Sequence, residues 1–158
     1  MMTVKGLIDE DFVQYKKPSM FIGFPTCSWK CEKECGQRVC QNSTLAKSPD
    51  IHIDIIDMID RYIKNPITEA VVIGGLEPID SFDQLESFIK EFRGYSNDDV
   101  VIYTGFYPYE IQNQIAILKQ YKNIIIKFGR YIPGQEKHYD EVLGVYLASD
   151  NQYAEKVS

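Results

Sequence analysis

Four cysteines, which are all that the chain contains, fall within one short stretch. Three residues separate Cys27 from Cys31, three more precede Cys35, and another four precede Cys40. Structural zinc sites usually draw on two ligand pairs that lie well apart in sequence, whereas one crowded loop can wrap around the several irons of an iron–sulfur cluster. The spacing therefore favours an iron–sulfur cluster over zinc, and both over incidental or redox thiols. Four cysteines could bind all four irons, and three would leave one iron open for a small molecule.

Two segments further along the chain offer groups that could contact a ligand. In "VIGGLEP", residues 72–78, Gly74 and Gly75 let the backbone approach a ligand, and Glu77 supplies a carboxylate before a stiffening proline. In "VIYTGFYPYE", residues 101–110, Thr104 and Gly105 close a buried strand. Taken alone, the first segment is more simply explained as a tight turn and the second as a strand end.

The elements that must position these residues follow from hydrophobic periodicity. The Phe82, Leu85 and Phe88 spacing, for example, indicates an amphipathic helix behind Ser81 as its N-cap. Strands alternating with helices predict parallel β-α-β units, in which ligands bind at the carboxyl ends of the strands. The cysteine stretch, "GGLEP" and "YTG" should therefore open onto the same edge. We expect strands over residues 19–24, 70–75, 99–105, 123–129 and 141–148, and helices over about 51–64, 82–93 and 107–121.

Composition limits the setting in which this chemistry could occur. The 158 residues suit one domain, residues 1–158, and 44% hydrophobic residues are enough for a core. A net charge of −6 argues against nucleic acid as a partner. No apolar run suggests export or membrane insertion, so the expected compartment is the cytoplasm, where clustered thiols stay reduced and available as metal ligands.

Taken together, the ordered motifs resemble the radical S-adenosylmethionine superfamily. They are most similar to its small members, the activating proteins of anaerobic ribonucleotide reductases. The likeness rests on "CSWKC" (27–31), "CQN" (40–42), "GGLEP" (74–78), "YTG" (103–105) and the C-terminal "ASDNQ" (148–152), and it spans about residues 19–153. It implies an α/β fold with a partial (incomplete) β/α barrel and a mostly parallel sheet.

The resemblance also implies a choice among the cysteines. In the superfamily an apolar or aromatic residue usually precedes the last cluster cysteine and lies against the adenine of S-adenosylmethionine. Val39 precedes Cys40, whereas Glu34 precedes Cys35. The implied ligands are Cys27, Cys31 and Cys40, and Cys35 is the alternative third ligand.

The implied activity is reductive cleavage of S-adenosylmethionine to a 5'-deoxyadenosyl radical. Three thiolates would hold a 4Fe-4S cluster, and the amino and carboxylate groups of S-adenosylmethionine would bind its open iron. Gly74, Gly75 and Glu77 would receive the methionine amino group, and Thr104 would belong to the same pocket. The implied partners are a glycyl-radical enzyme, such as anaerobic ribonucleotide reductase, and a flavodoxin- or ferredoxin-type electron donor. The alternatives are a radical enzyme acting on a small molecule or peptide, and a zinc-stabilised α/β binding module.

Overall fold

A six-stranded mixed sheet organises the computed structural model, which describes residues 1–26 and 43–158. Its strand order is β10-β7-β6-β5-β3-β2. The four central strands run parallel, and the two edge strands are antiparallel to their neighbours. The central strands are β3 (Ser19–Phe24), β5 (Ala70–Gly75), β6 (Asp99–Tyr103) and β7 (Ile124–Phe128), and the edge strands are β2 (Gly6–Asp11) and β10 (Tyr153–Lys156).

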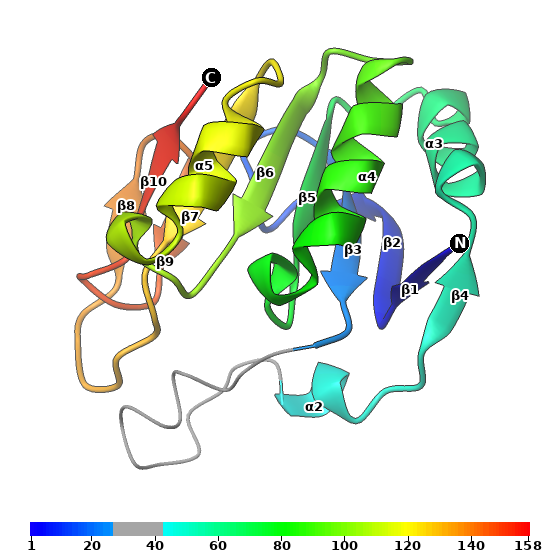
Figure 1. Ribbon diagram of the computed structural model, residues 1–158. Helices are drawn as coiled ribbons and strands as arrows, with labels where there is room; N and C mark the ends of the chain where they lie inside the picture. Colours follow the sequence, from blue (N-terminus) through cyan, green and yellow to red (C-terminus); the bar gives the residue numbers. More distant parts are fainter. Residues whose placement is uncertain (27–42) are drawn as a thin grey trace.

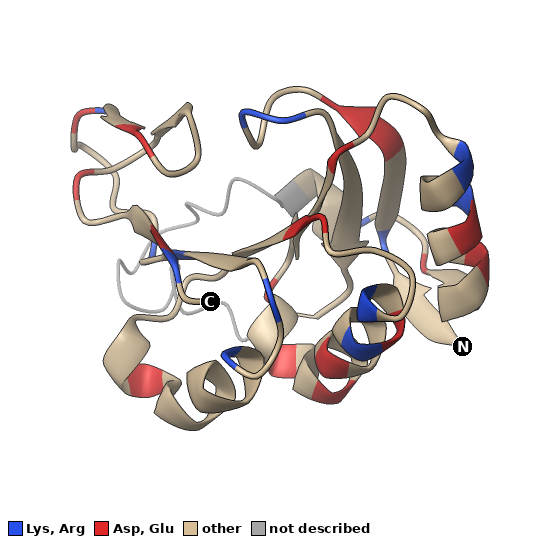
Figure 2. Ribbon diagram, turned by 90° about the horizontal axis from the view of Figure 1, so that it is seen from above, with Lys and Arg blue, Asp and Glu red and all other residues tan. Residues whose placement is uncertain are grey.

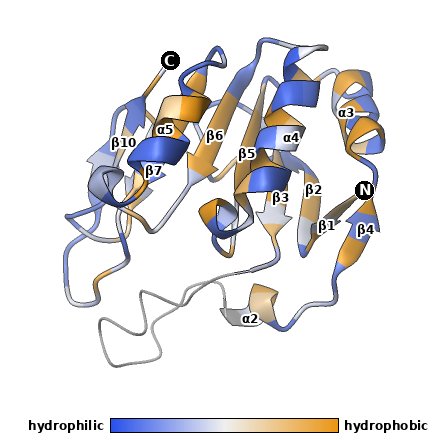
Figure 3. Cartoon of the chain, in the orientation of Figure 1, coloured by the Kyte–Doolittle hydropathy of each residue, from blue (hydrophilic) through white to orange (hydrophobic). Residues whose placement is uncertain are grey.

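Three helices connect the parallel strands and cover one face of the sheet, which we call the outer face (Figures 1 and 2). They are α3 (Ile55–Lys64), α4 (Phe82–Arg93) and α5 (Gln112–Leu118). Along the chain, β3, β5, β6 and β7 follow one another in one direction across the sheet. Right-handed crossovers between them therefore place these three helices on the same face. The apolar stripe of each helix turns toward the sheet and its polar residues face outward (Figure 3).

The main hydrophobic core lies between these helices and the outer face. Its largest fully buried side chains include Phe88 and Phe92 of α4 and Phe24 of β3. The Phe88 and Phe92 rings stack with centroids 5.6 Å apart. A Phe or Leu of this kind contributes about 1.5–3 kcal/mol when fully buried, so this layer supplies most of the hydrophobic stabilisation.

In the part of the chain that the structure describes, the opposite, inner face of the sheet is covered by loop residues and a short hairpin instead of helices. A smaller apolar cluster that includes Val72, Val101 and Ile125 packs here against Tyr15 and Leu143. Residues 12–17 and the hairpin of β8 (His138–Asp140) and β9 (Val145–Leu147) form this cover. The Lys16 amide donates to the Leu143 carbonyl at 2.8 Å and joins the two parts.

The remaining short elements lie at the margins of the sheet. Strand β1 (Met2–Val4) pairs with β4 (Ile51–Ile53) in a separate two-stranded sheet. Helix α2 (Ser43–Ala46) follows the undescribed segment, and two 3-10 turns, η1 (Pro78–Ser81) and η2 (Pro108–Glu110), precede α4 and α5. No helix in the described ranges is both long and apolar enough to cross a membrane.

The structure confirms the four central strands and the helix over residues 82–93 to within a few residues, and it corrects several other elements. Residues 51–53 form a strand, so the first helix begins at Ile55. The helix expected over 107–121 is a 3-10 turn followed by a helix over 112–118. The strand expected over 141–148 is limited to 145–147 and pairs in a hairpin outside the main sheet. Ser81 does precede α4, but its side chain makes no cap hydrogen bond.

An α/β fold with a mostly parallel centre is present, but the sheet is open in the described part of the chain. It ends at β2 on one side and at β10 on the other. A β/α barrel also adds each parallel strand on the same side of the one before it and keeps its helices on the outside. A partial barrel of the radical S-adenosylmethionine type stays a prediction.

We predict that Gly75→Ala destabilises the fold well beyond an ordinary glycine substitution. Gly75 has φ +81°, and a Cβ there would lie 2.7 Å from the Gly23 Cα and 2.8 Å from the Phe24 amide nitrogen. Gly134→Ala is the matched control, because Gly134 has φ +83° and no atom within 4 Å of the added Cβ. Both variants should lose about 1–2 kcal/mol of unfolding free energy, because alanine is strained in the left-handed region. Gly75→Ala should lose about 1–3 kcal/mol more, because its Cβ overpacks the β3 contact. Urea unfolding of both variants measures the difference, and equal losses would contradict the prediction.

Candidate functional site

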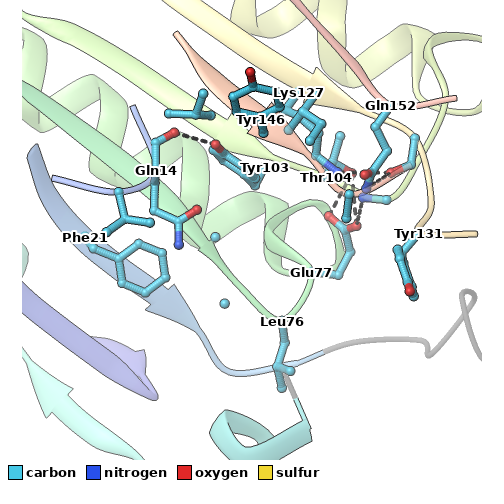
Figure 4. Close-up of a pocket in the computed structure, with 18 residues that line it drawn as sticks. Gln14, Phe21, Leu76, Glu77, Tyr103, Thr104, Lys127, Tyr131, Tyr146 and Gln152 are labelled. Atoms are coloured by element: carbon cyan, nitrogen blue, oxygen red, sulfur yellow. Dashed lines mark hydrogen bonds between the residues drawn. The ribbon is translucent and has the colours of Figure 1, made fainter. Parts of the chain in front are cut away.

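A cavity of about 450 Å³ opens at the carboxyl ends of the parallel strands and extends over the inner face of the sheet (Figure 4). This volume falls within the range of roughly 300–1,000 Å³ for small-molecule sites. The predicted residues Gly74, Gly75, Glu77 and Thr104 all line it. Glu77 of "GGLEP" and Thr104 of "YTG" are 27 residues apart in sequence. The structure therefore brings these two motifs together at one cavity.

The GGLEP turn owes its shape to the close approach of β3 and β5. Parallel pairing continues to the last residues, with Gly23 opposite Gly74 and Phe24 opposite Gly75. Beyond the strand, the Leu76 amide donates to the Phe24 carbonyl at 3.2 Å. Leu76, which stands between Gly75 and Glu77, therefore lines the cavity while its backbone stays bound to β3.

Glu77 is buried, with 6% of its surface exposed, and its carboxylate is held by three donors. The Gly105 amide donates to Oε1 at 2.7 Å, and the Ile79 amide donates to Oε2 at 3.0 Å. The Thr104 hydroxyl lies 3.0 Å from Oε1 and 2.9 Å from Oε2. Glu77 therefore ties the end of β5 to the end of β6.

The ionisation of Glu77 is set by opposing effects. Burial raises its pKa from 4.5 to about 7, and the nearby charge of Asp80 acts in the same direction. The hydrogen bonds from Gly105, Ile79 and Thr104 lower the pKa, but by less. A carboxylate in this balance can be ionised by a small change in its surroundings, such as the arrival of a cation.

Thr104 lines the cavity and is also hydrogen-bonded to Glu77. Its hydroxyl donates to Glu77 and accepts from the Phe106 amide at 3.1 Å. The side chain is 1% exposed. Thr104 therefore positions the Glu77 carboxylate, and its single proton satisfies only one of the two carboxylate oxygens at a time.

Both ends of the cysteine segment are fixed beside this turn. The Glu77 amide donates to the carbonyl of Thr26, the residue before Cys27, at 2.7 Å. The Thr26 hydroxyl lies 2.9 Å from that of Ser81. After the segment, Leu45 of α2 packs where a Cβ on Gly75 would lie, 2.9 Å away. The segment thus leaves and re-enters the described fold at the cavity's edge.

The predicted metal ligands themselves lie outside the described residues. This holds for Cys27, Cys31, Cys40 and the alternative Cys35, as well as for Val39. Within residues 1–26 and 43–158, no group of three or more His, Cys, Asp or Glu side chains is arranged to hold a metal ion. The choice among the cysteines stays a prediction.

Several residues of the cavity wall were missed by sequence reasoning. Tyr103 and Lys127 project from neighbouring strands, and Gln14 and Tyr146 come from the cover of the inner face (Figure 4). The signal for Lys127 was present, because a single charge interrupts the apolar run "NIIIKFG". The contributions of residues 12–17 and the hairpin carried no local signal, since they depend on how the chain folds back over the sheet.

The C-terminal "ASDNQ" stretch supports the far wall of the cavity. Asn151 donates to the Arg130 carbonyl at 2.6 Å and to the Tyr107 hydroxyl at 2.8 Å. Gln152 donates to the Gly129 carbonyl at 3.3 Å. Gly129 has φ +103°, and a Cβ there would lie 3.0 Å from the Asn151 carbonyl oxygen. This stretch therefore holds the turn that follows β7.

We predict that Thr104→Val raises the pKa of Glu77 above about 7, because it removes a donor that favours the ionised form. A carboxyl whose folded pKa is raised contributes stability that is present below its unfolded pKa and is lost as pH rises through the folded pKa. The free energy of unfolding of the variant should therefore be lower than that of the wild type by about 1–3 kcal/mol at pH 8, and by less at pH 5. Urea unfolding across this range, with ¹³C NMR titration of the Glu77 carboxyl, measures both effects.

Thr104→Ser is the matched control, since it keeps the hydroxyl and should retain the wild-type pKa. An unchanged carboxyl titration in Thr104→Val would show that the hydroxyl does not stabilise the Glu77 charge.

Comparison with known protein families matches residues 19–152 to the family described as the 4Fe-4S single cluster domain. Comparison with curated proteins and with solved structures gave no match. The family match begins at the first residue of β3, contains all four cysteines and ends at Gln152. It therefore covers the central strands, the cavity and the supporting C-terminal stretch, and the chain belongs to the 4Fe-4S single cluster domain family.

Proposed function

We propose that this chain is a radical S-adenosylmethionine protein that generates a glycyl radical on a partner enzyme such as anaerobic ribonucleotide reductase. The family match supports the 4Fe-4S cluster, and the ordered motifs of the sequence support the finer assignment. A flavodoxin- or ferredoxin-type protein would supply the electron, and the reducing cytoplasm would be its setting.

The observation that carries the proposal is the anchoring of both ends of the cysteine segment at the cavity. Thr26 is bound to the Glu77 backbone, and Leu45 packs against Gly75. In this proposal, the cluster held by the segment between them would lie beside the groups that line the cavity. A site for a small molecule beside an iron–sulfur cluster is what cleavage of S-adenosylmethionine requires.

The cysteines of the sequence fit the proposed cofactors. Cys27, Cys31 and Cys40 would bind the cluster, with Cys35 as the alternative to Cys40, and three thiolates would leave one iron for S-adenosylmethionine. With that molecule bound, one electron passing through the cluster would cleave a carbon–sulfur bond to methionine and a 5'-deoxyadenosyl radical, which takes a hydrogen atom from the partner's glycine.

Glu77 and the two glycines would receive the methionine amino group. Glu77 has acceptor capacity for this role, because the Thr104 hydroxyl shares one proton between both carboxylate oxygens. An approaching ammonium group would favour the ionised carboxylate and form a charge-assisted hydrogen bond with it. Gly74 lies on the inner face between Phe21 and Tyr103, where a side chain would narrow the cavity. Val39 would lie against the adenine.

The full-length chain, reconstituted anaerobically with iron and sulfide, tests the proposal. We expect brown protein with about four irons per chain, and release of 5'-deoxyadenosine after addition of dithionite and S-adenosylmethionine. Cys40→Ala should abolish the cleavage, and Cys35→Ala is the matched control that should retain it.

Two outcomes would contradict parts of the proposal. If Cys40→Ala still cleaved S-adenosylmethionine and Cys35→Ala did not, the third ligand would be Cys35. A colourless wild-type protein that binds one zinc and cleaves nothing would instead identify a zinc-stabilised module.

A further inference from the structure

Gln14 brings a neutral carboxamide to the cavity wall on a main chain that is held in place. The Gln14 amide nitrogen donates to Asp11 Oδ1 at 3.1 Å, and the Val13 amide nitrogen donates to the same oxygen at 2.8 Å. The Tyr103 hydroxyl donates to the Gln14 carbonyl. In the part of the chain that the structure describes, the hydrogen bonds of Gln14 are thus those of its main chain, and its side chain is not needed to hold the loop.

The wall that the Gln14 side chain faces has a glycine between two aromatic side chains. The carboxamide points into the cavity between Phe21 and Tyr103 (Figure 4). Gly74 lines the same cavity, and a Cβ there would lie 3.3 Å from the Phe21 ring and 3.5 Å from the Tyr103 Cβ. Gly74 therefore leaves room between the two rings for a flat group.

Exposed apolar side chains lie at the mouth of the cavity. Val13 and Tyr146 line the cavity and are nevertheless 74% and 70% exposed. Phe12, the residue before Val13, is 62% exposed. A small molecule enclosed in the cavity would leave these side chains in water, whereas apolar groups gathered around a polar site are typical of a surface that a larger partner covers. The mouth therefore favours a polypeptide that continues beyond the cavity.

A carboxamide matches the main chain of an extended polypeptide. It has one acceptor oxygen and an amino group with two donor hydrogens. The N–H and C=O of one residue in an extended chain point to the same side, so a single carboxamide can accept from the first and donate to the second. This contact requires no side chain on the bound residue, and a glycine therefore satisfies it fully.

We propose that Gln14 recognises the substrate by pairing its carboxamide with the main-chain N–H and C=O of an extended polypeptide segment, at the glycine that loses its hydrogen. This inference rests on the proposed function and narrows its substrate class to polypeptide. Val13 and Tyr146 contact the residues that flank the glycine. The loop that carries Gln14 is already ordered, so little of its conformational freedom is lost when the segment binds.

Binding of a main-chain probe to the reconstituted full-length chain tests the proposal. The probe is the blocked peptide acetyl-Ala-Ala-Gly-Ala-Ala-amide, titrated anaerobically with S-adenosylmethionine and without reductant, and followed by the NMR signals of the peptide. We expect saturable binding by the wild type and a dissociation constant about tenfold higher for Gln14→Leu. Gln120→Leu, which changes an exposed residue after α5, is the matched control and should bind as the wild type does.

A second probe measures whether the carboxamide meets the main chain directly. In this probe an ester oxygen replaces the N–H of the glycine, and the rest of the peptide is unchanged. The wild type should bind the ester about threefold more weakly than the peptide, whereas Gln14→Leu should bind the two equally. A residue that only supports the loop would give the same ratio in both proteins, and that result would overturn the proposal.

A wild type without saturable binding, or Gln14→Leu with the wild-type affinity for the peptide, would also overturn the proposal. Weaker binding of S-adenosylmethionine alone by Gln14→Leu would overturn it in favour of a contact between the carboxamide and the adenine of the cofactor. Gln14→Met, which lacks the amide as well, remains for measurement if Gln14→Leu fails to fold. Failure of the proposed function shows separately, as absence of 5'-deoxyadenosine after dithionite is added, because the binding measurements need no cleavage.

Discussion

The close contact of the β3 and β5 backbones at their carboxyl ends is the constraint on which the site depends. A side chain at Gly75 would overlap the backbone at Gly23 and Phe24, so only glycine allows the parallel pairing to reach the last residue. Once the strands are that close, the following amides of Leu76 and Glu77 reach the carbonyls of β3 and of Thr26. The entry of the cysteine segment is therefore fixed by main-chain hydrogen bonds, which do not depend on any side chain of that segment.

The same contact directs a carboxylate into the interior, where its charge must be balanced. Glu77 follows the β3 contact directly and meets the end of β6, where Thr104 and the Gly105 amide face it. Burial favours the neutral acid and the donors favour the anion, which places the pKa of Glu77 at about 7. An environment of this kind is poised between two charge states, and such groups are concentrated at functional sites. The carboxylate also links two strand ends, so its ionisation and the geometry of the cavity wall are coupled.

The parts of this fold that sequence could predict are those that depend on local periodicity. "SMFIGF", "AVVIGG" and "NIIIKFG" are recognisable as buried strands because each is a short, mostly apolar run, and α4 follows from a stripe at helical spacing. Ile51 also matched the helical stripe that continues at Ile55 and Met58, but pairing with β1 across about 50 residues makes residues 51–53 a strand. The edge strands β2 and β10 were missed for a related reason: "GLIDED" and "YAEK" are polar and gain their structure from a buried neighbour.

The residues of the candidate site also fall into two groups, those that local sequence predicts and those that depend on the tertiary fold. Glycines and a carboxylate after a strand could be recognised from types and spacing, and the structure places Gly74, Gly75, Glu77 and Thr104 around one cavity. The bonds between Thr104 and Glu77 required the strand order, which places β5 beside β6. The contribution of Gln14 could not be predicted, since the Tyr103 hydroxyl binds its carbonyl only after residues 12–17 cross the inner face.

The two faces of the sheet have different physical roles, and this difference allows a polar cavity in a small domain. The outer face packs against three amphipathic helices and carries the large aromatic core. The inner face has only a small apolar cluster, so polar groups such as Glu77 and Lys127 can occupy it without removing much hydrophobic stabilisation. Their cost is limited because each is hydrogen-bonded, through Thr104 and Gly105 for the carboxylate and through Gly129 for the ammonium group. In residues 1–26 and 43–158 the three long helices all lie on the outer face, so the cavity can open over the inner face, where its polar side chains can meet a ligand.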